Sequence, residues 1–102
     1  MKVPLLDLKA QYAAIKDKIR QRIDAICDSQ MFILGQTVES FEKRIADYSG
    51  TTYAIGMSSG TDAILAALMA FDIGPGDGVI TSPYTFFATA GCIARLKATP
   101  IF

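Results

Sequence analysis

The chain has 102 residues, 51% of them hydrophobic, and its ten basic residues balance its ten acidic residues. This length and apolar content suit one folded domain and exclude a disordered protein, while the neutral charge and the lack of a long apolar run exclude nucleic-acid and membrane-bound classes. Histidine is absent, which removes most zinc sites and Ser-His-Asp triads. Asp7 comes too early for a secretory signal, and Cys27 and Cys92 are expected to be small apolar residues, so we expect a cytoplasmic protein.

Residues 1–50 are predicted to form an amino-terminal helical segment. Apolar side chains recur every three or four positions over residues 8–26, which is the spacing of one helix face. Pro4 is a start signal for this helix, and the apolar connector 31–34 is expected to pack against another part of the protein. A second short helix is predicted to have Thr37 as its N-cap and to end before Gly50.

Residues 51–102 follow a different pattern, in which strands and helices alternate. We predict a buried strand at 52–57, a helix at 63–71, a turn at 73–78, a strand at 79–81, a helix at 85–96 and a third strand beginning at 98. This order is typical of a parallel sheet with right-handed crossovers. Because no helix follows the last strand to cover the sheet, we expect an incomplete domain that belongs to a larger α/β enzyme.

The first candidate site is the run Ser58-Ser59-Gly60-Thr61-Asp62, between a predicted strand and a predicted helix. The first turn of a helix has unpaired N–H groups and a positive dipole end, so it can bind a phosphate without a basic side chain. Gly60 would let the phosphate approach the backbone, and the neighbouring hydroxyls could donate to it. An ordinary Ser/Thr/Asp helix cap explains the same five residues equally well.

The second candidate site is the run 82–90, which follows the next predicted strand and is rich in aromatic residues. Ligands of open parallel sheets bind beyond the carboxyl ends of the strands, where an aromatic ring can stack on a planar ligand. We interpret Tyr84 and Phe87 as ordinary core residues.

Several motifs occur together in one order and spacing: Phe41-Glu42, Ser59-Gly60-Thr61-Asp62-Ala63, Gly74-Pro75-Gly76-Asp77, Val79-Ile80-Thr81 and the run from Pro83 to Ala90. Together they resemble the amino-terminal part of the DegT/StrS family of pyridoxal-phosphate-dependent sugar aminotransferases. The resemblance implies an α/β fold: the amino-terminal part of the large domain of an aspartate-aminotransferase-like (fold type I) PLP-dependent transferase, with a truncated parallel or mixed sheet and flanking helices.

The resemblance also implies a cofactor, pyridoxal 5′-phosphate (PLP), and the residues that would bind it. Its phosphate would lie at Ser59, Gly60, Thr61 and Asp62, with backbone amides as the main donors, and Phe86 would stack on its ring. The family's Schiff-base lysine and the acidic residue at the pyridine nitrogen would lie beyond residue 102. We therefore expect no catalytic residue and no metal ligand within these residues.

The function that the resemblance implies is transfer of an amino group from glutamate, or a similar donor, to a keto-sugar linked to a nucleotide. The full-length enzyme would be a homodimer, and the chain alone would be inactive. Two alternatives stay open: a PLP-dependent sugar dehydratase of the same family, and a non-catalytic interaction or dimerisation module. Two residues depart from the family pattern. Gly78 stands where the family usually has an acidic residue, and the glycine would loosen the turn before a strand. Lys97 stands at a helix end where the family usually has glycine.

Overall fold

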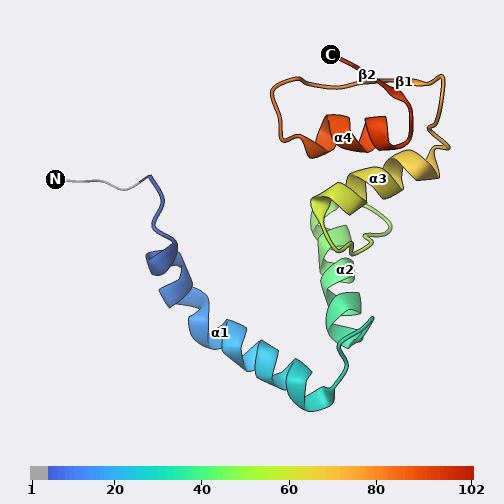
Figure 1. Ribbon diagram of the computed structural model, residues 1–102. Coiled ribbons are helices and arrows are strands. Elements are labelled where there is room, and N and C mark those ends of the chain that lie inside the picture. The colour runs from blue at the N-terminus through green and yellow to red at the C-terminus, as the bar shows by residue number, and fades with distance from the viewer. Residues whose placement is uncertain (1–4) are drawn as a thin grey trace. The chain divides into compact units, whose positions relative to one another are not determined.

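The computed structural model describes residues 5–102, which form two compact units that divide between Ala54 and Ile55 (Figure 1). Pro4, the expected start signal of the first helix, lies outside the described residues. None of the described helices combines the length and the hydropathy that crossing a membrane requires.

The first unit begins with the long helix α1, Leu8–Ser29, as the apolar periodicity predicted (Figure 1). Asp7 is its N-cap, because the carboxylate accepts a hydrogen bond from the amide of Ala10 at 3.0 Å. No residue of α1 is buried, and its apolar stripe is largely exposed. The sequence therefore forms the helix through its own backbone hydrogen bonds, without cover on its apolar face.

Helix α2, Gln36–Ser49, starts earlier than predicted, so Thr37 as N-cap is wrong. Gly35 is the N-cap, because its carbonyl already accepts from the amides of Val38 and Glu39, at 2.9 and 3.3 Å. The helix ends as expected at Gly50, whose φ of 67° is the left-handed conformation that glycine adopts at low cost. The preceding connector, 31–34, is exposed, contrary to the expectation that it packs.

The buried strand predicted at 52–57 does not form. The backbone there is irregular, and Tyr53, Ile55 and Met57 are exposed. A strand needs a hydrogen-bonded neighbour, and the sheet in the described part of the chain consists of two later strands only. The apolar composition of the segment was therefore not sufficient to make it a strand.

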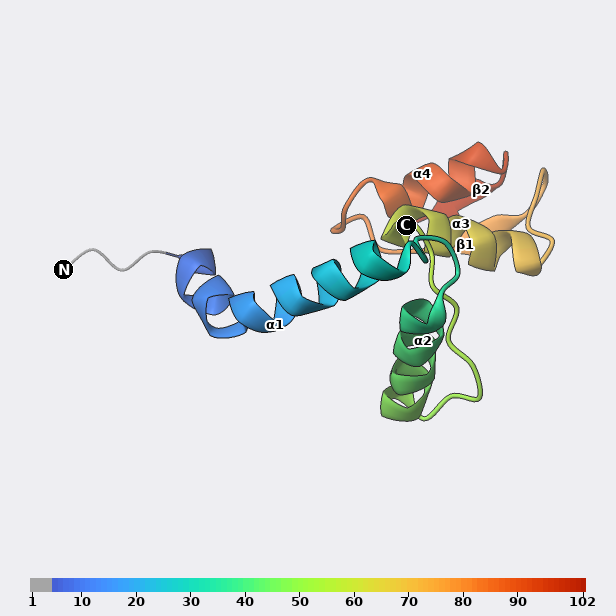
Figure 2. The ribbon, with the colours of Figure 1, turned by 90° about the horizontal axis from the view of Figure 1, so that it is seen from below.

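The second unit contains the α/β pattern: α3 (Gly60–Ala70), β1 (Gly78–Ile80), α4 (Ala88–Arg95) and β2 (Thr99–Ile101) (Figures 1 and 2). The two strands are parallel, with Val79 opposite Pro100, and α4 forms the connection between them. Two parallel strands joined through a helix confirm the predicted fold class for this half of the chain. The predicted turn is also present, with the amide of Gly74 donating to the carboxylate of Asp77 at 2.8 Å.

The core of the second unit is centred on α4. Ala88, Cys92 and Ile93 are buried on this helix, and Ala98 is buried just after it. The helix is shorter than the predicted 85–96, because residues 82–87 are irregular. In that segment the amide of Tyr84 donates to the Ser82 hydroxyl at 3.2 Å. Hydroxyls that bond nearby amides in this way compete with helix formation.

The two departures from the family pattern have structural consequences. Gly78 was expected to loosen a turn, but it lies in β1, where a Cβ atom would come within 2.6 Å of Ile101 Cδ1. Ile101 therefore occupies the space that a side chain at position 78 would fill. Lys97 has a φ of 62°, which confirms that a non-glycine residue takes the strained left-handed conformation after α4.

Candidate functional site

The candidate phosphate site is the first turn of α3. Ser59 is the N-cap, in extended conformation, and its hydroxyl accepts a hydrogen bond from the amide of Asp62 at 3.1 Å. The carbonyl of Ser59 accepts from the amide of Ala63 at 3.0 Å. The amide of Asp62 is one of the four amides that a helix start leaves without an intrahelical partner, and the Ser59 side chain satisfies it; the Ala63 bond is the first bond of the helix itself.

The amides of Gly60 and Thr61 belong to the same set of four, and they have no acceptor among residues 5–102. A Cβ atom on Gly60 would meet no heavy atom within 4 Å, so the space beside this backbone is open. The Thr61 hydroxyl also has no hydrogen-bond partner in the described chain. Two free amides, a free hydroxyl and the positive end of the helix dipole form an arrangement that fits an anion of the size of a phosphate.

The carboxylate of Asp62 is hydrogen-bonded within the same turn. Its Oδ2 accepts from the hydroxyls of Ser58, at 2.5 Å, and Ser59, at 2.9 Å. These hydrogen bonds lower the pKa of Asp62 below its usual value of 3.8, and the positive charge of Arg95 lowers it further. Asp62 is therefore ionised at neutral pH.

The first turn of α3 is attached to the core of the second unit through Thr61. The buried thiol of Cys92, on α4, donates to the carbonyl of Thr61 at 3.3 Å. Figures 1 and 2 show that the N-terminal ends of α3 and α4 lie on the same side of this unit. The sequence contained no signal for this contact, because the two residues are distant in the chain and a lone cysteine reads as a small apolar residue.

The aromatic segment before α4 is exposed. Tyr84 and Phe87 are 97% and 80% exposed, so their prediction as core residues is wrong. The Phe87 ring instead lies against Gly91, where a Cβ atom would come within 2.8 Å of it. Phe86 is 77% exposed, and its carbonyl accepts from the amide of Thr89 at 3.2 Å. Its side chain is accessible to a ligand, and its stacking role stays a prediction.

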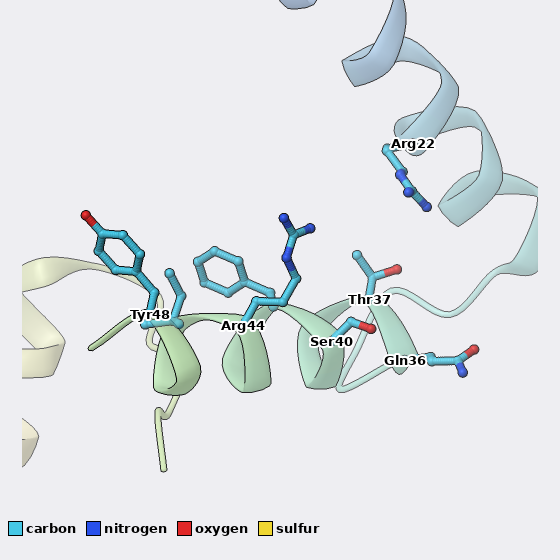
Figure 3. A pocket seen from close by; sticks show the side chains of 8 residues that line it. Arg22, Gln36, Thr37, Ser40, Arg44 and Tyr48 are labelled. Atoms are coloured by element: carbon cyan, nitrogen blue, oxygen red, sulfur yellow. The ribbon is translucent and has the colours of Figure 1, made fainter. Parts of the chain in front are cut away.

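A separate cavity of about 740 Å³ lies in the first unit, between α1 and α2 (Figure 3). It is lined by Arg22 of α1 and by residues of α2 that include Phe41, Arg44 and Tyr48. None of the predicted site residues lines this cavity. In residues 5–102 no cluster of acidic or cysteine side chains could hold a metal ion. The first turn of α3 is therefore the candidate site that both the sequence and the local geometry support.

Curated relatives match all or most of the chain. A protein from Geobacillus stearothermophilus named pleiotropic regulatory protein is 50% identical over 102 residues, which are 100% of this chain and 27% of that protein. The UDP-2-acetamido-2-deoxy-3-oxo-D-glucuronate aminotransferase of Pseudomonas aeruginosa is 43% identical over 98% of this chain and 28% of its own length. The chain thus spans little more than a quarter of the length of these relatives.

Solved structures share the backbone of the described elements. An aminotransferase from Brucella abortus matches with a TM-score of 0.92 at 37% identity, over 99% of this chain and 27% of that one. A Bacillus subtilis protein solved with the bound cofactor PMP matches with a TM-score of 0.90 at 32% identity, over 99% of this chain and 23% of that one. The model of the DegT/DnrJ/EryC1/StrS aminotransferase family matches residues 13–102, and the chain belongs to this family.

Proposed function

We propose that these 102 residues are the amino-terminal part of a PLP-dependent aminotransferase that moves an amino group from glutamate, or a similar donor, to a keto-sugar nucleotide. The observation that carries this proposal is the first turn of α3, where the free amides of Gly60 and Thr61 face open space. The bound PMP in the Bacillus subtilis relative supports the cofactor class. The Pseudomonas aeruginosa relative, which is named for a UDP-linked 3-oxo sugar, supports the substrate class.

In this proposal the chain binds the cofactor through its phosphate and one face of its ring. The amides of Gly60 and Thr61 and the Thr61 hydroxyl would hold the phosphate, and the exposed ring of Phe86 would be the stacking partner of the pyridine. PLP, when bound, supplies a ring that withdraws electrons from the reacting carbon. These residues would position that ring, because contacts to both its phosphate and one of its faces would limit its movement.

The chain by itself is proposed to be inactive. Transamination requires a lysine beside the cofactor, and no lysine lies between residues 44 and 96, the segment that contains both binding runs. Lys43 lies in α2, and Lys97 follows the C-terminal end of α4. The catalytic lysine, much of the sugar-nucleotide site and the homodimer partner would come from the rest of the enzyme. The free thiols of Cys27 and Cys92 support a reducing, cytoplasmic location.

The proposal is tested with the purified full-length protein. We expect it to retain a chromophore with the absorption of bound PLP, and to aminate a UDP- or dTDP-linked keto-sugar when glutamate is supplied. The isolated 102-residue chain, assayed in parallel, is expected to give no turnover. Full-length protein that neither retains nor takes up PLP would refute the proposal. PLP binding with release of water from the sugar, and no amine transfer, would favour the dehydratase.

A further inference from the structure

We call the free amides of Gly60 and Thr61, together with the Thr61 hydroxyl, the phosphate cradle. We infer that Asp62 is a positioning residue of this cradle and not a ligand of the phosphate. The inference rests on the proposed function, because it concerns how the same helix start is prepared for the cofactor. Three hydrogen bonds carry it: those from the hydroxyls of Ser58 and Ser59 to the carboxylate, and the one from the Asp62 amide back to Ser59 Oγ. Together they close a small ring of bonds around the last loop residues and the first turn.

The donor proton of the Ser59 hydroxyl is engaged in this ring. A serine hydroxyl has one proton, and here that proton points to Asp62 Oδ2, so it is not available to a phosphate oxygen. Its lone pair accepts from the amide of Asp62, so that amide is also engaged. The hydroxyl of Ser58 donates to the same carboxylate oxygen. The groups that stay free to donate are the amides of Gly60 and Thr61 and the Thr61 hydroxyl.

The charge of Asp62 leads to the same assignment. An ionised carboxylate only accepts hydrogen bonds, and it repels a phosphate dianion at short range. Its favourable partners are instead the serine hydroxyls, the positive end of the α3 dipole and the nearby guanidinium of Arg95. Asp62 thus holds Ser58 and Ser59 in place, and this fixes the direction in which the two free amides point.

The experiment compares binding of PLP and of pyridoxal, the same molecule without the phosphate, to the full-length apo-protein by absorbance titration. The dissociation constant of pyridoxal divided by that of PLP measures how much the phosphate cradle strengthens binding. In Asp62→Ala the bonds from the two serine hydroxyls to the carboxylate are lost, and we expect this ratio to fall about fivefold, which is the usual net effect of losing one hydrogen bond. In Asp62→Asn, whose side-chain oxygen can still accept from both serines, we expect the ratio to stay at the wild-type value or to rise.

Asp77→Ala serves as the matched control. Asp77 also accepts a hydrogen bond from a backbone amide in the second unit, that of Gly74, but it lies beyond the other end of α3. Its loss should lower the melting temperature and leave the binding ratio unchanged. This control separates general destabilisation from an effect on the cradle.

The outcomes distinguish the inference from the proposed function. An Asp62→Ala protein that keeps the wild-type ratio, or an Asp62→Asn protein as weak as Asp62→Ala, would overturn the positioning role while leaving the aminotransferase proposal intact. Wild-type protein that binds PLP no better than pyridoxal would overturn the phosphate cradle itself, and the inference with it.

Discussion

Helices α1 and α4 have apolar side chains at helical spacing, yet they differ in what covers them. None of the 22 residues of α1 is buried, whereas three of the eight residues of α4 are. Helix α4 packs against α3 and β2, which follow the pattern of a parallel α/β unit. The comparison shows that apolar periodicity predicts a helix, while burial depends on elements that come together from elsewhere in the chain.

The largest expected difference between these helices is in the effect of removing one isoleucine. Ile93 is 2% exposed and Ile19 is 38% exposed. We expect Ile93→Ala to lower the free energy of unfolding by about 2–5 kcal/mol, because it leaves a cavity in the core. Ile19→Ala should lower it by about 1 kcal/mol or less. Urea unfolding of the 102-residue chain, followed by circular dichroism, measures both; equal effects would show that α1 is buried in solution.

A second comparison concerns the starts of α3 and α2. Ser59 caps α3 through its side chain, whereas Thr37 lies inside α2 and its predicted capping role is wrong. We expect Ser59→Ala to destabilise the chain by about 1 kcal/mol. Thr37→Ala should change the free energy of unfolding by less than about 0.5 kcal/mol. The same unfolding assay applies, and a large effect at Thr37 would contradict the observed helix start.

At two helix ends, substitutions are expected to change the stability of the chain in opposite directions. Lys97 and Gly50 both have left-handed backbones, with φ of 62° and 67°. Lys97→Gly should stabilise the chain by about 0.5–1 kcal/mol, because glycine adopts this conformation without strain. Gly50→Ala should destabilise it by a similar amount. The shift in melting temperature gives the sign of each, and destabilisation by Lys97→Gly would show that other contacts of Lys97 outweigh its strain.

The smallest expected effect is the pH dependence that Asp62 contributes. Because its pKa is lowered in the folded state, its stabilising contribution is complete above about pH 4 and is lost as pH falls through the lower, folded pKa. The difference in stability between wild type and Asp62→Asn should therefore shrink as the pH is lowered from neutral to below the usual aspartate value of 3.8. Thermal melts of both proteins across this range test this prediction. A stability difference that grows on acidification would contradict the lowered pKa of Asp62.

Much of the fold could be predicted from the sequence where local signals decide it. The stripe of α1, the glycine that ends α2 and the turn from Gly74 to Asp77 all depend on residues close in the chain. The strand expected at 52–57 depends on a neighbour that periodicity cannot identify, and that prediction is wrong. The irregular backbone before α4 was missed for a related reason, because its serine-to-amide bond competes with the helix.

The candidate site was predictable in part. A Ser/Thr/Asp run ahead of an apolar helix indicated the cap and the phosphate cradle, since both depend on the same unpaired amides. The ring of bonds around Asp62 could not be read from the sequence, because either serine could equally have faced solvent. The contact between Cys92 and Thr61 joins two helices and needs the tertiary structure to be seen.

The backbone of Thr61 connects two environments. Its carbonyl oxygen faces the buried thiol of Cys92, and the amide of the same residue is free at the start of α3. A ligand that orders this amide also favours the conformation in which the carbonyl meets α4, so occupancy and core stability are thermodynamically linked. Cofactor binding in the full-length protein should therefore slow amide hydrogen exchange in α4, a helix that the phosphate need not touch.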